Sequence, residues 1–234
     1  MVTRSNLRTL SSLLLGLPMA LLACAEATGP GQGDDVEIRA SARGPAVQNG
    51  STGFSIEIER ILVVVGRVKL EKAGTTPTDY VDERSVVVEL DPGANPVLAI
   101  SVDVPDGDFK ELEIAVDKLE PGESREQQLI DLYPALRDGS FLVEGRVLEA
   151  GRAESFRFVS DLDIDLELSF DPPLRIAGTD APTTLVSLSL DITHWFRTVT
   201  GELLDPRDPA SRSAIESNVQ KSIELFEGPV DTGS

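Results

Sequence analysis

The chain has 234 residues, of which 40 are acidic and 21 are Lys or Arg, so its formal net charge is -19. This balance argues against nucleic acid as a partner, because phosphate contacts require clustered Lys and Arg. It also argues against direct attraction to anionic lipid headgroups, while it is compatible with divalent cations. Hydrophobic residues make up 41% of the chain, which excludes disorder by composition. The single cysteine excludes an internal disulfide, so packing and strand pairing are expected to stabilise the fold.

The first 23 residues have the features of an export signal. Arg4 and Arg8 are followed by a mostly apolar run from Leu10 to Leu22. This run is shorter than the roughly 20 apolar residues that a bilayer-spanning helix needs, and it suits the apolar core of a secretory signal. We therefore predict a signal peptide over residues 1–23. Residues 24–35 are rich in Gly, Ala and polar residues, a composition typical of a flexible tether.

The apolar run ends in LLAC, residues 21–24, which resembles the lipobox of bacterial lipoproteins. The resemblance implies that the thiol of Cys24 receives a diacylglyceryl group and that the peptide is cut before Cys24. Acyl chains then hold the protein in a bilayer. Ala25 favours the outer membrane, because an Asp there resembles an inner-membrane retention signal in enteric bacteria. The alternative is an ordinary signal cut after Ala20 or Ala23, with Cys24 an incidental free thiol.

Strand signals dominate from Val36 to Asp191. Apolar and polar residues alternate in segments such as VEIRAS and FKELEIAV, which is typical of strands with one buried face. The apolar run Ile61–Val65 indicates a strand covered on both faces, and Gly66 indicates a bulge or bend. Two apolar runs joined by EAGR, residues 149–152, predict a β-hairpin. About nine or ten such strands predict an antiparallel β-sandwich in a single domain, residues 36–228.

One helix is expected near the end of the chain, over residues 209–226. Asp208 can cap it, and Pro209 suits the first helical position. Apolar residues recur at helical spacing at Ile215, Val219, Ile223 and Phe226. Gly228 ends the pattern, and residues 229–234 are expected to form a frayed tail.

Residues 85–116 resemble a strand–loop–strand–turn–strand pattern found in uncharacterised bacterial lipoproteins of transthyretin-like β-sandwich type. Pro105, Gly107 and Phe109 match a Pro-x-Gly-x-aromatic turn that leads into an alternating strand. In such a turn Pro fixes φ, and Gly tolerates a φ that other residues disfavour. A second match covers residues 188–206 and 215–226. The resemblance implies a fold, and it supplies no catalytic residue because the function of the family is unknown.

A ladder of carboxylates alternates with leucine and isoleucine in SDLDIDLELSF; it consists of Asp161, Asp163, Asp165 and Glu167. Same-face neighbours in a strand lie about 6.6–7 Å apart. Two of them therefore chelate Ca²⁺ poorly, since its oxygen ligands lie at about 2.3–2.6 Å. A closed site needs ligands from a neighbouring strand or loop. The alternative is a solvated acidic face, balanced by Lys or Arg on a paired strand.

The turn DVPDGD is a second candidate for Ca²⁺, through Asp103, Asp106 and Asp108. Loop carboxylates and carbonyls bind Ca²⁺, although this spacing does not match an EF-hand loop. The alternative is that these residues only shape the turn.

The segment DITHWF contains the only histidine and the only tryptophan, His194 and Trp195. Zinc binding needs further ligands, and a hydrolytic triad needs a serine and an acid brought to His194 by folding, since no G-x-S-x-G motif is present. Trp195 and Phe196 are expected to close one end of the sandwich beside the helix. The alternative is that the indole face of Trp195 stacks on a sugar.

These observations lead to a non-enzymatic lipoprotein with a structural or interaction role in the bacterial cell envelope, at the outer membrane. Acylated Cys24 joins it to the bilayer, and its further partner is an envelope protein or glycan. No cofactor is expected. Two alternatives stay open: a Ca²⁺- or carbohydrate-binding module that uses the carboxylate ladder or Trp195, and a hydrolase that uses His194.

Overall fold

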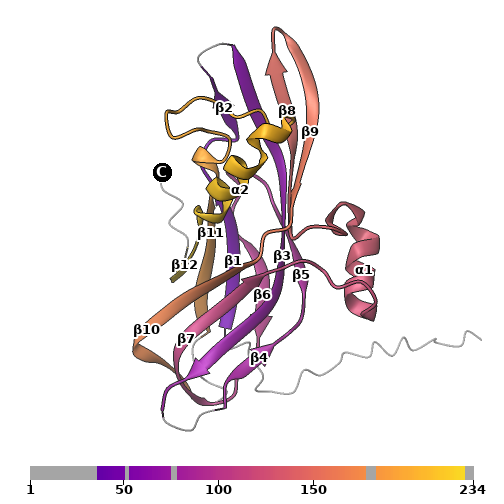
Figure 1. Ribbon diagram of the computed structural model, residues 1–234. Helices are drawn as coiled ribbons and strands as arrows, with labels where there is room; N and C mark the ends of the chain where they lie inside the picture. The colour runs from indigo at the N-terminus through magenta and orange to yellow at the C-terminus, as the bar shows by residue number, and fades with distance from the viewer. Residues whose placement is uncertain (1–35, 51–52, 75–77, 178–182, 230–234) are drawn as a thin grey trace, which may run out of the picture. The chain divides into compact units, whose positions relative to one another are not determined.

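Two β-sheets face each other across a shared hydrophobic core (Figure 1). The computed structural model describes residues 36–50, 53–74, 78–177 and 183–229. This part of the chain is mainly β, as predicted, and it lies within one compact unit. It contains twelve strands, so the predicted nine or ten were too few. Two strands of three residues each, β2 (Val47–Asn49) and β4 (Tyr80–Asp82), are too short to show an alternating pattern.

The smaller sheet has four strands in the order β12 (Ile223–Glu227), β11 (Thr184–Asp191), β1 (Val36–Arg43) and β6 (Val97–Val102). β1 pairs with β6 in antiparallel fashion and with β11 in parallel, from Val36 opposite Thr184 to Arg43 opposite Asp191. The prediction of a wholly antiparallel fold was therefore wrong. Alternation along a strand reports which face is buried and carries no information about the direction of a partner far away in sequence.

The larger sheet is organised by β3 (Phe54–Lys72), a strand of 19 residues. The other members of this sheet, besides β2 and β4, are β5 (Val86–Leu90), β7 (Gly107–Val116), β8 (Phe141–Glu149), β9 (Arg152–Ser160) and β10 (Ile164–Ile176). β8 pairs with the first half of β3 and β7 with the second half. The register with β7 shifts between Val65 and Arg67, so the bulge predicted at Gly66 is confirmed. β8 and β9 form the predicted hairpin.

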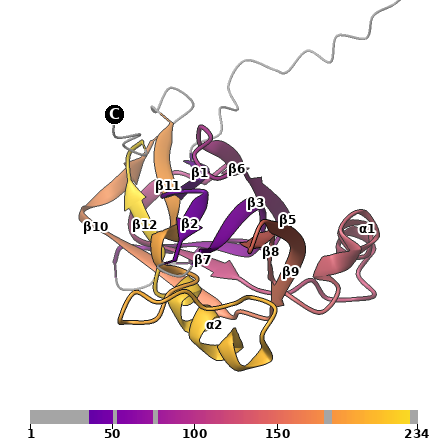
Figure 2. The same ribbon diagram turned by 90° about the horizontal axis from the view of Figure 1, so that it is seen from above.

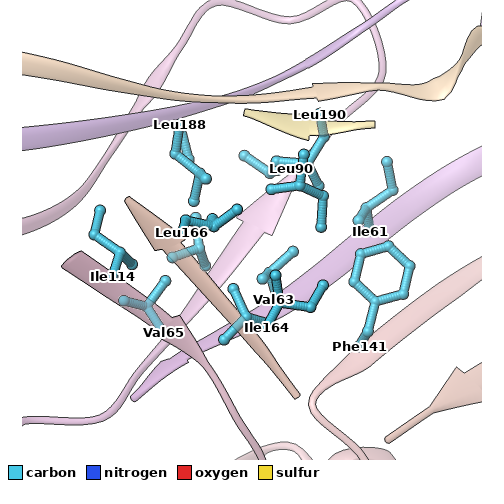
Figure 3. Packing of buried hydrophobic residues seen from close by; sticks show 14 of the residues in the cluster. Ile61, Val63, Val65, Leu90, Ile114, Phe141, Ile164, Leu166, Leu188 and Leu190 are labelled. Carbon is cyan, nitrogen blue, oxygen red and sulfur yellow. The ribbon is translucent and has the colours of Figure 1, made fainter. Parts of the chain in front are cut away.

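The apolar run of β3 is buried on both of its faces, as predicted. Ile61, Val63 and Val65 belong to the cluster between the two sheets, whereas Leu62 and Val64 belong to a separate cluster on the other face. Figure 3 shows the cluster between the sheets, where Leu188 and Leu190 of β11 point toward Leu166 and Leu90.

The outer face of the larger sheet is covered by α1 (Ser124–Leu132) and a 3₁₀ turn, Pro134–Leu136, neither of which was predicted. Ile130 and Leu136 pack there against Leu62. The second helix, α2 (Arg212–Gln220), packs through Ile215 and Val219 against the cluster between the sheets. The two helices therefore lie on opposite faces of the larger sheet, and Figure 2 shows them well apart.

The C-terminal helix is shorter than the predicted 209–226. Asp208 accepts a hydrogen bond from the backbone N of Ala210 at 2.9 Å, and a 3₁₀ turn, Pro209–Ser211, precedes α2. The chain then turns, and Ile223 and Phe226 lie in β12, opposite Leu190 and Ser187 of β11. IELF fits a strand as well as a helix, and pairing with β11 decides in favour of the strand. None of the described helices has the length and hydropathy of a bilayer-spanning segment.

Candidate functional site

The predicted anchor lies outside the described residues. This applies to the signal peptide, residues 1–23, to Cys24 with the tether, residues 24–35, and to residues 230–234 of the predicted tail. The described chain begins at Val36, the first residue of β1.

The carboxylate ladder runs into β10, at the edge of the larger sheet. Its four carboxylates are exposed, while Leu162, Ile164 and Leu166 between them are buried, which confirms the alternation. Asp165 Oδ1 lies 3.3 Å from Arg67 Nη2, and Asp161 Oδ2 lies 3.3 Å from Lys118 Nζ. Two of the four carboxylates therefore have a basic partner, but neither partner lies on β7, the strand that pairs with β10, so the expected balance by a paired strand is met only in part.

Arg67, one basic partner of the ladder, also pairs with an acid on β7. Arg67 of β3 also forms an ion pair with Glu113 of β7, and Lys69 Nζ lies 3.3 Å from Glu113 Oε2. The basic side chains thus come from β3, whereas β7 and β10 both contribute acids, with Glu113 directly opposite Glu167. No group of three or more His, Cys, Asp or Glu side chains among the described residues is arranged to hold a metal ion. The geometry does not bring a closed Ca²⁺ site together on this face.

The acidic loop before α1 also reaches the ladder, which the sequence did not reveal. A pocket of about 370 Å³ is lined by residues of β3, β7 and β10 and of the neighbouring loops, and Arg67 and Lys118 are its basic lining residues. Its acidic lining residues are Glu83, Asp117, Glu120, Glu123, Glu126, Asp163 and Asp165. Glu126 accepts hydrogen bonds from the hydroxyl of Ser85 and the backbone N of Glu120, so it has a structural task in this loop.

The turn with Asp103, Asp106 and Asp108 carries the chain from β6 to β7, and these carboxylates are exposed. The backbone O of Asp106 accepts from Lys72 Nζ at 3.4 Å, and that of Asp108 accepts from the N of Ala73 at 2.8 Å. Both interactions fix the turn.

The glycine of this turn has a different role from the one predicted. Gly107 is absent from the described residues with positive φ. A Cβ added to Gly107 would instead lie 3.0 Å from Cε of Lys72, whose ammonium lies 5.7 Å from the centre of the Phe109 ring. Gly107 therefore makes room for the side chain of Lys72 rather than for an unusual backbone angle.

Trp195 and Phe196 follow a 3₁₀ turn, Ile192–His194, and both are fully buried. Trp195 meets Phe141 edge-on at 5.3 Å between ring centres, and Phe196 meets Phe156 in the same way at 5.6 Å. Their predicted burial beside the C-terminal helix is confirmed, since Asn218 of α2 donates to the backbone O of Trp195. The alternative of sugar stacking on Trp195 requires an exposed indole face, and the indole is covered by the core.

His194 itself is exposed and lines a pocket of about 500 Å³, here called the His194 pocket. The pocket is lined by Arg43, Gly44, Ser189, Asp191, Thr193, His194, Asn218, Lys221, Ser222 and Glu224. Nδ2 of Asn218 donates to the backbone O atoms of His194, Trp195 and Arg197 at 3.0, 3.1 and 2.8 Å, which fixes the wall of the pocket.

No hydrogen bond among the described residues joins the imidazole of His194 to a hydroxyl or a carboxylate. The nearby hydroxyl of Ser222 accepts from Trp195 Nε1 and donates to the backbone O of Val219, and Asp191 Oδ1 accepts from the N of Thr193. The serine and the acid that a triad requires are therefore used for other contacts in this structure.

Most of the lining of the His194 pocket carried no signal in the sequence. Arg43 lies at the end of β1, Asn218 in α2 and Lys221 directly after it. The parallel register that sets Arg43 opposite Asp191 is what brings these distant segments together. Comparison of the chain with protein-family models, with curated proteins and with solved structures found no match.

Proposed function

We propose that the protein is an exported lipoprotein, held at a membrane by acyl chains on Cys24, whose β domain acts by non-enzymatic interaction with a component of the bacterial envelope. The observation that carries the proposal is LLAC, residues 21–24, at the end of a short apolar run behind Arg4 and Arg8. The only thiol of the chain stands at the position that lipoproteins modify. Each acyl methylene that enters the bilayer contributes about 0.8 kcal/mol, so two or three chains hold a protein stably.

The distance between Cys24 and the fold suits this arrangement. β1 begins at Val36 and lies inside the smaller sheet, between β6 and β11. The intervening segment spans at most about 40 Å when extended. The net charge of -19 opposes contact between the domain and anionic headgroups, so a tether of this length serves to hold the domain away from the bilayer.

The absence of an acid directly after Cys24 supports the outer membrane as the location. Ala25 occupies the position where Asp resembles an inner-membrane retention signal in enteric bacteria. The proposal places the domain on the periplasmic side or at the cell surface, and its partner is an envelope protein or a glycan.

We also propose that the two sheets form a β-sandwich. Side chains from both sheets share one cluster, for example Leu188 and Leu190 from β11 with Ile61 and Val63 from β3 (Figure 3). In a sandwich with aligned sheets the mean strand directions differ by about 30°. An experimental structure tests this directly, and strands crossing at about 90° would contradict it.

Metabolic labelling tests the lipid anchor. The full chain is expressed in a bacterial host with an alkyne fatty acid, and its intact mass and membrane association are measured. We expect a mature N-terminus at Cys24 with the added mass of diacylglyceryl and acyl groups, and recovery with the outer membrane. Cys24→Ser abolishes the label, and the neighbouring change Ala25→Ser keeps it. Labelled Cys24→Ser, or an unmodified wild-type N-terminus, would contradict the proposal.

A further inference from the structure

We propose that the His194 pocket binds a small hydroxylated ligand that carries an oxyanion, a carboxylate or a phosphate, and that Arg43 is its main recognition residue. The pocket lies where β1, β11 and β12 meet the 3₁₀ turn after β11 and α2. Its volume of about 500 Å³ is within the range of small-molecule sites. The inference adds a ligand class to the proposed interaction role and does not depend on acylation of Cys24.

Three basic groups without a carboxylate partner surround this pocket. Among the described residues, Arg43, Lys221 and His194 form no ion pair, although the chain has 40 acidic residues to offer. Other arginines are paired: Arg60 Nε lies 2.7 Å from Glu89 and Arg207 Nη2 lies 2.7 Å from Asp205. Arg43 and Lys221 thus keep charged donors free for an anionic ligand, although Asp191 and Glu224 in the same lining balance their formal charges.

Arg43 is held in place and has unused hydrogen-bonding capacity. Its guanidinium carbon lies 5.1 Å from the centre of the Phe226 ring, a cation–π contact that orients the planar group. Nε of Arg43 is buried and has no hydrogen-bond partner. Because Nε is buried, an oxyanion in the pocket can pair only with the terminal Nη groups of the guanidinium, which form no hydrogen bond or ion pair among the described residues. Arginine suits carboxylate and phosphate because its fork of N–H groups matches their geometry.

A row of small hydroxyl side chains leaves space beside Arg43. Ser41 and Ser189 face each other across β1 and β11, on the face that is turned away from Leu188 and Leu190. They are only 4% and 6% exposed, and the Oγ of Ser41 has no hydrogen-bond partner in the described structure. Ser189 lines the pocket and can donate to a ligand oxygen there, whereas Ser41 lies opposite it on β1 and is not part of the lining.

The acidic lining residues indicate which other groups the ligand carries besides its oxyanion. Glu224 of β12 and Asp191 also face the pocket, and Asp191 uses Oδ1 for the backbone N of Thr193. Carboxylates accept hydrogen bonds and repel a bare anion. A ligand that satisfies both sets of groups therefore combines one oxyanion with several hydroxyl donors, as sugar acids and sugar phosphates do.

Calorimetric titration of the full chain in detergent tests the ligand class, with glucuronate, glucose 6-phosphate, inorganic phosphate and neutral glucose as probes. We expect at least one charged sugar to bind at least about tenfold more tightly than glucose. The two charged sugars distinguish a carboxylate site from a phosphate site. Binding of inorganic phosphate as tightly as the better sugar would contradict the need for a hydroxylated body. Equal affinity for glucose, or no heat with either charged sugar at millimolar concentration, would overturn the proposal.

Variants of two arginines on one strand locate the site. Arg43→Gln should weaken binding at least about tenfold, and Arg43→Lys, which keeps the charge without the fork, should lie between. Arg39→Gln is the matched control, because Arg39 lies four residues before Arg43 on β1 and pairs with Glu37 at 3.1 Å outside the pocket. Circular dichroism verifies that each variant is folded, and if Arg43→Gln is not folded the comparison uses Arg43→Lys.

The single histidine gives an independent readout. In a full chain that carries no histidine tag, the imidazole signals in an NMR spectrum come from His194 alone. Adding the tighter-binding charged sugar should shift these signals in the wild type and in Arg39→Gln. Unshifted His194 signals, despite binding heat, would place the ligand elsewhere and overturn the assignment. Labelling of Cys24 is measured separately, so failure of the anchor and failure of the pocket are distinguishable.

Discussion

Nε1 of Trp195 donates a hydrogen bond to Oγ of Ser222 at 2.6 Å, and that hydroxyl donates to the backbone O of Val219 at 2.7 Å. The pair joins the buried aromatic cluster after β11 to the turn between α2 and β12. We expect Ser222→Ala to lower the free energy of unfolding by about 1–3 kcal/mol, because it leaves a buried donor without a partner. Urea unfolding followed by the fluorescence of Trp195, the only tryptophan, measures the change.

Ser213→Ala is the control for this prediction. Ser213 is exposed in α2, so its replacement should leave the urea midpoint nearly unchanged. Ser222→Thr keeps a hydroxyl and should recover most of the stability. A midpoint of Ser222→Ala equal to that of the wild type would show that the indole finds another acceptor.

Two glycines in the larger sheet should respond in opposite ways to an added methyl group. A Cβ on Gly145 of β8 would lie 2.1 Å from the backbone O of Glu57, whereas a Cβ on Gly66 would approach nothing closer than 3.6 Å, at Cβ of Asp117. We expect Gly145→Ala to destabilise the fold by about 3 kcal/mol or more, because β3 and β8 must separate. Gly66→Ala should change stability by less than about 1 kcal/mol. Thermal unfolding of both variants is the measurement, and similar melting temperatures would contradict the strand spacing described here.

The hairpin turn between β8 and β9 contains a residue in an unfavourable conformation. Ala150 has a φ of 49° and Gly151 a φ of 76°, the left-handed pair that two-residue hairpin turns require. Replacing Ala150 by Gly removes a steric cost of roughly 1–2 kcal/mol, partly offset by the greater freedom of glycine in the unfolded chain. We expect a net gain of about 0.5 kcal/mol.

Ala153 provides the opposite case in the same hairpin. It is exposed in β9, where φ is not positive, so Ala153→Gly should lose about 0.5–1 kcal/mol. Chemical unfolding of the two single variants compares them under one condition. Destabilisation by Ala150→Gly would be inconsistent with a left-handed residue at this position.

Asp205 should contribute stability that depends on pH. Two hydrogen bonds from Arg207, of 2.9 Å from Nε and 2.7 Å from Nη2, hold the pKa of Asp205 below its ordinary value of 3.8, although partial burial opposes this. The folded state therefore binds the proton less readily than the unfolded chain does. The contribution is complete above pH 3.8 and is lost as the pH falls through the lowered pKa of the folded state.

Asp205→Asn tests this dependence. At pH 7 we expect it to reduce the free energy of unfolding by about 1 kcal/mol, and the difference from the wild type should shrink as the pH falls below 3.8. Glu202→Gln is the control, since Glu202 is exposed and its carboxylate has no ion pair among the described residues. A wild-type difference that stays constant down to pH 2 would contradict the role of Arg207.

The sequence predicts burial better than it predicts pairing. Alternation identified the exposed side of β10 at Asp165 and Glu167, and the continuous run Ile61–Val65 identified a strand buried on both faces. Both patterns are local, because each records which side chains leave water. The partner of a strand is not local. Nothing near Val36 indicates that β1 runs parallel to β11.

Competition between patterns explains the errors at the C-terminus and around α1. Ile223 and Phe226 continue the helical spacing of Ile215 and Val219, yet Ile223, Glu224 and Leu225 also alternate as in a strand. The edge of β11 provides hydrogen-bond partners that the end of a helix lacks, so this segment forms a strand that pairs with β11. The sequence does not predict the helix α1, because SREQQLIDL has few apolar residues and stands in a long polar stretch.

Of the residues that line the His194 pocket, the sequence indicated only His194 as a candidate site residue. His194 and Trp195 are the only residues of their types in the chain, which made them candidates. In the structure His194 is exposed and Trp195 is fully buried. Arg43 and Lys221 are ordinary surface residue types in the sequence. Their importance arises because neither forms an ion pair among the described residues, although Asp191 and Glu224 line the same pocket, and only the three-dimensional arrangement reveals this.

The position of β11 between β1 and β12 has a consequence for biosynthesis. β1 can pair with its second neighbour, β11, only after residues 184–191 have been made. β11 in turn pairs with β12, which follows it in the sequence. A nascent chain emerging from the ribosome therefore cannot close its smaller sheet before residues 184–227 have been made. If the chain is exported as proposed, such late closure would favour threading through an export channel, because the polypeptide stays loosely structured until β11 has been made.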